Sequence, residues 1–325
     1  MAAIGLDLGG TKLSGALFGD GGEMLVRRVA GLERRGGADV GLLVRGMAEE
    51  LLASAEQERA SVSGIGVSVP GIAFHATGHV WAPNIPGWEH YPLRDELEAS
   101  DRPPHCPVVL ESDRACSILG EHWRGAARGC SHAIFVAVGT GIGLGVLVNG
   151  HVLRGAHDIA GATGWMALDR PFREEYRACG CFEFAASGDG LVRVARNLLR
   201  EMPEYRGALR QIPDDSMTAR DIFSAYDRQD PVALRTLSQA IAYWGMATAN
   251  YVSLFDPERV IFGGGVFGPA VRFIPAIRTE AEKWAQPISM QKVEIVPAEL
   301  GADAALFGAG YLALRAAGGN LPEPR

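Results

Sequence analysis

Apolar residues near the start of the chain recur at every second position, the spacing of a β-strand with one buried face. The run 4–8 ends at the pair Gly9-Gly10, and the run 13–18 resumes the same extended pattern. Two such runs joined by a glycine pair are typical of a β-hairpin. The chain is therefore predicted to begin with a hairpin.

Helical spacing of apolar residues, with three or four positions between them, marks the longer segments. It predicts helices over 39–59, from 112–113 through 123, from 187 through 199, over 218–256 with a break at Asp230-Pro231, over about 271–284 and over 302–316. Short apolar runs predict strands at 63–69, 107–111, 133–138, 260–262 and 293–296, and the prolines of 78–88 predict a loop. The alternation predicts an α/β protein.

Length and composition restrict the classes of protein further. At 325 residues and 34.6 kDa, two lobes with a cleft between them are expected. The net charge of −7 argues against nucleic acid as the main partner, and five cysteines suggest no disulfide framework. No signal segment or bilayer-spanning run is present, so we expect a cytoplasmic protein with no membrane partner.

The tip of the first hairpin has the residue types that bind phosphate. Gly9 and Gly10 permit positive φ and bring backbone N–H groups close to an anion. Thr11 adds a hydroxyl donor and Lys12 a positive charge, while Asp7, just inside the loop, can hold Mg²⁺ directly or through water. A ligand-free Gly-Gly turn fits the same residues, and the spacing is not that of a Walker A loop.

Two further glycine loops favour the phosphate interpretation. Gly139-Thr140-Gly141-Ile142-Gly143 follows the apolar strand at 133–138, and Gly263-Gly264-Gly265 follows the strand at 260–262. Three such loops are what an actin-like nucleotide cleft requires: two grip phosphates, and one backbone turn packs on the adenosine. We therefore expect ATP as a ligand.

With these loops in place, the chain resembles the ROK family (repressors, open reading frames, kinases), whose best-known members are bacterial sugar kinases. The resemblance runs in order through the Asp7-to-Lys12 hairpin, residues 66–71, 82–88, Ser112-Asp113, 139–143, 179–183, 263–265 and 300–303. It implies an actin-like ATPase (ribonuclease H-like) fold. Its lobes are expected at 1–113 plus about 301–325, and at about 114–300.

The resemblance also implies roles for single residues. Asp113 matches the catalytic aspartate that accepts the proton of the attacking sugar hydroxyl, and Ser112 stands where relatives usually have Asn. Asn84 and Glu183 match sugar-binding positions. From the residues alone, Ser112 or Asp113 as a helix N-cap and Asn84 as a turn cap are the favoured interpretations.

The chain departs from the family where relatives have Gly-Glu-x-Gly-His. Here the segment reads Gly161-Ala162-Thr163-Gly164-Trp165, so the Glu and His that reach the anomeric end of the sugar are absent. The zinc motif is reduced to Cys179-Gly180-Cys181, and two thiols cannot fill a tetrahedral site, so no structural zinc is predicted. Trp165 becomes a candidate sugar contact, suited to a C1- or C2-modified sugar or a cyclitol.

The predicted function is an ATP- and Mg²⁺-dependent kinase acting on a primary hydroxyl of a hexose, most simply the 6-hydroxyl. A catalytically weak sugar sensor of the same family is the alternative. A transcription regulator fits poorly, because the chain is acidic and begins at the hairpin. Polyphosphate as donor is left open, although no concentrated Lys/Arg run offers a track for it. The family suggests a homodimer or higher homo-oligomer.

Overall fold

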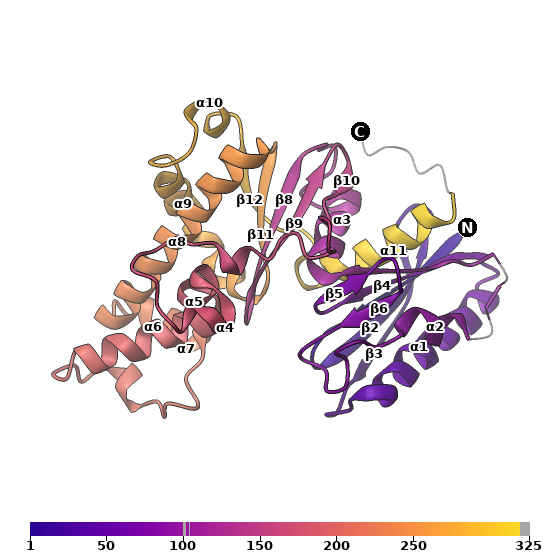
Figure 1. Cartoon of the computed structure of the whole chain (residues 1–325), viewed down its shortest axis with the longest axis horizontal. Helices are drawn as coiled ribbons and strands as arrows, with labels where there is room; N and C mark the ends of the chain where they lie inside the picture. The colour runs from indigo at the N-terminus through magenta and orange to yellow at the C-terminus, as the bar shows by residue number, and fades with distance from the viewer. Residues whose placement is uncertain (100–101, 104, 319–325) are drawn as a thin grey trace. The chain divides into compact units, whose positions relative to one another are not determined.

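The computed structural model describes residues 1–99, 102–103 and 105–318, and its mixed α/β architecture confirms the predicted class. The chain divides into two compact units, each described here by itself. Unit 1 comprises Met1–Ser131, Gly145–Ala160 and Ala298–Arg325, and unit 2 comprises His132–Leu144 and Gly161–Pro297. The elements of both are labelled in Figure 1.

Unit 1 is built on a five-stranded sheet in the order β3-β2-β1-β4-β7. Its strands are β1 (Ala2–Leu8), β2 (Lys12–Gly19), β3 (Met24–Gly31), β4 (Val62–Val69) and β7 (Val108–Ser112). The predicted hairpin is confirmed, because β1 pairs antiparallel with β2 through Leu8↔Leu13. Strand β3 was not predicted: it is a half-exposed edge strand whose Arg27 and Arg28 obscure the apolar alternation.

Helices cover both faces of this sheet (Figure 1). They are α1 (Gly37–Gln57), α2 (Leu93–Glu98), α3 (Asp113–Arg124) and α11 (Ala304–Ala316). The segment 78–88, predicted as a loop, contains the short strand β6 (His79–Trp81), which pairs antiparallel with β5 (Ile72–Phe74). Ile4 and Leu6 join the core cluster that includes Val44 of α1, whereas a Cβ on Gly5 would lie 2.7 Å from the Gly310 nitrogen of α11. Because strand side chains alternate, Asp7 belongs to the α11 face.

Unit 2 contains the parallel strands β8 (Ala133–Val138), β11 (Arg259–Gly263) and β12 (Glu294–Pro297). They belong to a sheet ordered β10-β9-β8-β11-β12, in which β9 (Ile142–Val148) begins in unit 2 and ends in unit 1, and β10 (His151–Val152) lies in unit 1. Ala137 pairs with Gly263, so the two glycine loops leave neighbouring strands at the same edge.

The helices of unit 2 largely follow the predicted pattern. They are α4 (Tyr176–Cys179), α5 (Cys181–Ala186), α6 (Gly188–Glu201), α7 (Ala219–Tyr226), α8 (Pro231–Phe255), α9 (Ile274–Ala281) and α10 (Pro287–Met290). Short 3-10 turns are η1 (Thr163–Trp165), η2 (Ala208–Gln211), η3 (Gly265–Phe267), η4 (Pro269–Phe273) and, in unit 1, η5 (Gly301–Asp303). No helix within the described ranges is long and apolar enough to cross a membrane.

One predicted helix differs. The segment about 271–284 is not continuous: η4 runs to Phe273 and α9 begins at Ile274. Proline is the physical reason, because Pro275 lacks the N–H that a helix interior needs and fits only the first turn. The break predicted at Asp230 is confirmed: its carboxylate caps α8 by accepting hydrogen bonds from the Val232 and Ala233 amides at 2.9 and 3.1 Å.

Candidate active site

The tip of the first hairpin is a tight loop in which the Gly9 N–H donates to the Lys12 carbonyl at 2.9 Å. Neither Gly9 nor Gly10 has a positive φ, which differs from the expectation, because the loop closes without a left-handed residue. Gly10, Thr11 and Lys12 are exposed, and a Cβ added to Gly10 would meet the Asn84 Cβ at 3.6 Å. The bare loop backbone therefore lies beside Asn84, which is also exposed.

Asp7 lies below this loop in a partly buried position. The Ser68 hydroxyl donates a hydrogen bond to its Oδ1 at 2.8 Å. Burial raises the pKa of Asp7 to about 6; the Ser68 hydrogen bond opposes this shift, and the charges of Asp113 and Asp303 add to it. Asp7 and Asp113 are thus electrostatically coupled acids. Sequence reasoning gave Ser68 no role, although it lies in the 66–71 segment shared with the family.

Asp113 begins α3 directly after β7. Ser112 occupies the N-cap position but makes no side-chain cap hydrogen bond, so simple capping does not account for it. The Asp113 Oδ1 accepts the Arg114 backbone N–H at 2.7 Å. Part of the Asp113 side chain is open to solvent, yet the surrounding protein raises its pKa through desolvation, against the opposing charge of Arg114. A raised pKa suits a general base.

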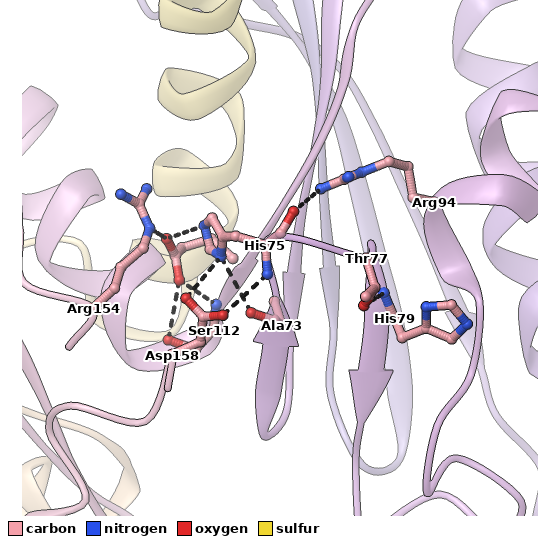
Figure 2. Close-up of polar contacts among 9 residues, drawn as sticks. Ala73, His75, Thr77, His79, Arg94, Ser112, Arg154 and Asp158 are labelled. Carbon is pink, nitrogen blue, oxygen red and sulfur yellow. Dashed lines mark hydrogen bonds and ion pairs between the residues drawn. The ribbon is translucent and has the colours of Figure 1, made fainter. Parts of the chain in front are cut away.

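A buried polar network surrounds Glu111, two residues before Asp113, and no sequence motif predicts it. Glu111 is only 3% exposed. Its carboxylate accepts the Ser112 N–H at 2.9 Å and the Arg154 Nε–H at 2.7 Å, and the His75 Nε2 lies 3.2 Å away. On its other side, His75 Nδ1 is 3.4 Å from Asp158 (Figure 2). The strand end that carries Asp113 is therefore tied to residues 154–158.

In unit 2, the loop after β8 is closed by backbone hydrogen bonds. Gly139 donates to the Gly141 carbonyl at 2.9 Å, and Gly188 at the start of α6 donates to the Gly139 carbonyl at 2.7 Å. A Cβ on Gly139 would meet nothing within 4 Å, so an anion can approach the backbone there. A helix N-terminus beside the loop adds a favourable dipole for phosphate.

Glu183 supports this same loop. Its Oε2 accepts the Ile142 N–H at 2.7 Å, and a Cβ on Gly141 would lie 2.6 Å from that oxygen. Burial raises the pKa of Glu183, while the Ile142 hydrogen bond lowers it. The turn at Gly164 packs on the same side chain, so Glu183 joins the loop to the segment that ends at Trp165. One carboxylate oxygen of Glu183 therefore already accepts a hydrogen bond from the backbone.

A pocket of about 740 Å³ lies entirely within unit 2. Of the predicted phosphate and adenosine residues, it is lined by Gly139, Thr140 and Gly265. Gly264 has φ +87° and packs against Val138, whose carbonyl oxygen would lie 2.4 Å from an added Cβ, and Gly263 ends β11. Sequence reasoning missed several lining residues on the helices: Gly188, Asp189, Val192, Met217, Thr218, Ala219, Arg220, Phe223, Val266 and Pro269.

The segment that departs from the family folds as η1. Trp165 is 57% exposed, and the hydroxyl of the buried Thr163 in the same turn lies 2.5 Å from that of Tyr251. Cys179 and Cys181 are free thiols on either side of Gly180. Within the described ranges, no group of three or more His, Cys, Asp or Glu side chains is placed to hold a metal ion.

The predicted residues thus form two sets. Asp7, the 9–12 loop, Asn84, Ser112 and Asp113 lie in unit 1, while the other two glycine loops, Glu183 and Trp165 lie in unit 2. The α/β fold, with acids near one glycine loop and a helix N-terminus beside another, is that of the actin-like ATPase class, a class that the solved neighbours share.

Comparison with known proteins identifies the family. The ROK family model matches residues 3–316, so the chain belongs to the ROK family. It is 31% identical over 316 residues to a glucokinase of Halalkalibacterium halodurans, covering 95% of this chain and 94% of the relative. A ROK hexokinase structure from Thermus thermophilus matches with a TM-score of 0.77 and 32% identity over 97% of this chain and 99% of that one. A ROK glucokinase from Streptomyces griseus, solved with glucose and AMPPNP, matches with a TM-score of 0.75 and 26% identity over 97% and 100%.

Proposed function

We propose that this protein is an ATP-dependent sugar kinase that transfers the γ-phosphoryl group to a primary hydroxyl of a hexose or a close relative of one. The general class, an ATP-dependent hexose kinase, rests on the glucokinase and hexokinase relatives. The residue assignment rests on one observation above all. Asp113 and Asp7 are coupled acids in the same unit as an exposed glycine loop whose backbone lies beside Asn84.

In this proposal, Asp113 accepts the proton of the sugar hydroxyl as that oxygen attacks the γ-phosphorus. Asn84, Ser112 and Glu183 hold the sugar, with Trp165 against its modified end. Gly9, Gly10, Thr11 and Lys12 hold phosphates from unit 1, and Gly139, Thr140 and Gly141 hold them from unit 2. Gly263, Gly264 and Gly265 flank the adenosine.

Mg²⁺ is the metal that this chemistry implies. The hard carboxylate oxygens of Asp7, with the charges of Asp113 and Asp303 nearby, suit such a cation. When bound, the ion neutralises phosphate charge during transfer. The role of the chain is to keep Asp7 ionised and oriented, which the Ser68 hydroxyl supports through its hydrogen bond at 2.8 Å.

The acceptor is proposed to be a hexose changed at C1 or C2, or a cyclitol. Ala162 and Trp165 stand where two polar partners are expected, and the indole of Trp165 is 57% exposed. An exposed aromatic face stacks on an apolar group better than it binds hydroxyls.

The lobes are proposed to comprise 1–113 plus about 301–325, and about 114–300; of these, residues 319–325 lie outside the described residues. The proposal further retains a cytoplasmic location, where ATP is available, and a homo-oligomer.

The test is coupled ADP release with Mg²⁺-ATP across glucose, mannose, fructose, N-acetylhexosamines, β-glucosides and cyclitols. Turnover on one acceptor that disappears in Asp113→Asn is expected, because general-base catalysis contributes about 10²–10⁴-fold and the amide cannot accept the proton. Asp95→Asn, an exposed acid of α2, is the control. Equal turnover in Asp113→Asn would overturn the assignment of the base.

A sugar sensor is the second candidate, and the loss of both polar residues at 162 and 165 favours it. Silence across the whole panel, together with thermal stabilisation by one of the sugars, is the result that supports this reading over the kinase.

A further inference from the structure

Helix α6 carries a row of arginines along a second pocket of unit 2. Arg193, Arg196 and Arg200 are spaced three and four residues apart, so they share one face of the helix. They line a pocket of about 390 Å³, a size at the lower end of ligand sites. We call it the α6 arginine groove; its lining is Asp189, Val192, Arg193, Arg196, Asn197, Arg200 and Met217.

Among the described residues, none of these three guanidinium groups forms an ion pair with a carboxylate. Arg193 donates to the Phe184 carbonyl at 2.7 Å, and Arg200 donates to the Asn197 side chain at 3.1 Å, both neutral acceptors. The Nε of Arg196 is buried and has no hydrogen-bond partner among the described residues. The charge of Arg193 interacts with Glu183, whose pKa it lowers, but within the described ranges the two side chains form no ion pair.

Arg193, Arg196 and Arg200 differ in this respect from the arginines that form ion pairs. The chain carries a net charge of −7, and eleven of its arginines form ion pairs with carboxylates in the described part of the structure. Three guanidinium groups on one helix face repel each other, which is unfavourable unless an anion joins them. A concave surface with one sign of charge concentrates counter-ions of the other sign.

The groove also continues from the larger pocket. Asp189, Val192 and Met217 line both, and a fourth arginine, Arg220, lines the larger one. The row from residue 193 to residue 200 spans about 10 Å along the helix axis, which suits an extended anion better than one compact group. The planar guanidinium group of arginine can donate two parallel hydrogen bonds to two oxygens of one phosphate group.

We propose that the α6 arginine groove is an oxyanion subsite for a linear chain of phosphate groups. Two sources of such a ligand are distinguishable. It is either the distal part of a phosphate-chain donor whose terminal group reaches Thr140, or a separate effector that binds beside the nucleotide. Only the donor source rests on the proposed kinase function.

The first experiment is calorimetric titration of the full chain with inorganic tripolyphosphate at low ionic strength. Saturable binding is expected, and Arg196→Gln/Arg200→Gln should weaken it by about tenfold or more, because two charge-assisted contacts are lost. Arg200→Gln alone, at an exposed position, should weaken binding less and guards against misfolding of the double variant. Arg228→Gln is the matched control, since Arg228 is exposed and its Nε–H donates to the Ser224 carbonyl at 3.2 Å.

Absence of saturable binding up to about 1 mM, or equal weakening in Arg228→Gln, would overturn the proposal.

The second experiment separates the two sources of the ligand: tripolyphosphate is supplied with the accepted sugar and without ATP. In the donor case, the sugar oxygen forms a bond to the terminal phosphorus, the bridging P–O bond breaks, the hydroxyl proton goes to Asp113 and diphosphate is released. Binding without diphosphate release, but with a changed KM for ATP, identifies an effector. Tripolyphosphate binding in a protein that phosphorylates no sugar, from either ATP or tripolyphosphate, would refute the kinase function and leave the groove proposal standing.

Discussion

At the scale of single residues, the site is governed by buried acids. Asp7 and Glu111 are both withdrawn from water, but by different means: Asp7 has a hydroxyl partner and a raised pKa, whereas Glu111 has a backbone amide and a guanidinium. Desolvation is unfavourable for a carboxylate unless its lone pairs are satisfied. A carboxylate that stays ionised in such a place lowers the free energy of unfolding of the protein. Its charge is kept for its role in the reaction.

Asp7 should therefore show opposite effects on stability and activity. Its pKa rises from 3.8 in the unfolded chain to about 6 in the folded one. The folded state binds the proton more tightly, so the stability contributed by protonated Asp7 is full below about pH 4 and is lost as pH rises to about 6. Asp7→Asn should raise the Tm by about 2–4 °C near pH 8 and have little effect near pH 4. It should also abolish Mg²⁺-ATP turnover.

Calorimetry at both pH values, with exposed Asp214→Asn as the control, checks this prediction. A Tm that falls in Asp7→Asn near pH 8 would show that the charged form stabilises the fold.

The Glu111–Arg154 pair should be coupled in a double-mutant cycle. Arg154→Met leaves the buried Glu111 carboxylate without its guanidinium, so the free energy of unfolding should fall by about 2 kcal/mol, less than for a fully buried pair because the Arg154 side chain is 38% exposed. Glu111→Gln/Arg154→Met should recover part of that loss. Urea unfolding measures both, and Arg45→Met, whose Glu49 partner lies on the α1 surface, should change stability by less than about 1 kcal/mol.

Additive effects of the Glu111 and Arg154 changes would contradict the coupling. In the active protein, kcat should fall along with stability, because Glu111 holds the amide of Ser112 just before Asp113.

At the scale of elements, strand ends and helix starts build the site. Strand β8 ends in a glycine loop, and the N-terminus of α6 closes on that loop through the Gly188-to-Gly139 hydrogen bond. Strand β7 runs directly into α3 at Asp113. Parallel strands place their carboxyl ends at one edge, and backbone N–H groups at helix starts favour anions there.

Two glycines of the β8 loop should respond differently to alanine. Gly139→Ala adds a methyl group to open space, so stability should hold while the KM for ATP rises by about tenfold or more, because the methyl group keeps phosphate from the backbone. Gly141→Ala forces a Cβ to within 2.6 Å of the Glu183 carboxylate and should lower stability by about 1–3 kcal/mol. Thermal unfolding and ATP kinetics on both variants test the contrast. Loss of stability in Gly139→Ala would refute the assignment of that open space to ligand.

At the scale of the whole molecule, each unit holds a self-contained part of the machinery. The pocket of about 740 Å³ is lined only by unit 2, from Gly139 to Pro269. Asp7, Asn84 and Asp113 belong to unit 1. The surface proposed for adenosine therefore lies in unit 2, whereas the proposed general base lies in unit 1.

Hydrogen exchange should reveal this division. Adenosine alone, which lacks phosphates, should slow exchange at 188–192 and 217–223 and leave the unit 1 segment 82–88 unchanged, because its binding surface lies in unit 2. Mass spectrometry of peptides from both units measures it, and inosine, with a different base edge, serves as the comparison ligand. Protection confined to 82–88 would refute the pocket assignment.

The sequence by itself determined the elements and the chemistry that depends on local pattern. Period-two alternation specifies the first hairpin, helical spacing and Asp230-Pro231 specify the break before α8, and glycines directly after apolar strands mark the loops at 139–143 and 263–265. These features are local, because burial of one face and the conformational limits of proline act within a few residues. The family resemblance, which rests on the same motifs, extended the prediction from the elements to the class of reaction.

Only the tertiary structure decided which distant residues meet. Glu111 meets His75 and Arg154 across long stretches of chain, and Glu183 binds the Ile142 amide across a separation of 41 residues. The arginines of α6 form no run in the sequence and become one row only when the helix forms beside Met217. Polar contacts of this kind carry no periodic signal, because their partners are chosen by topology rather than by neighbours in the chain.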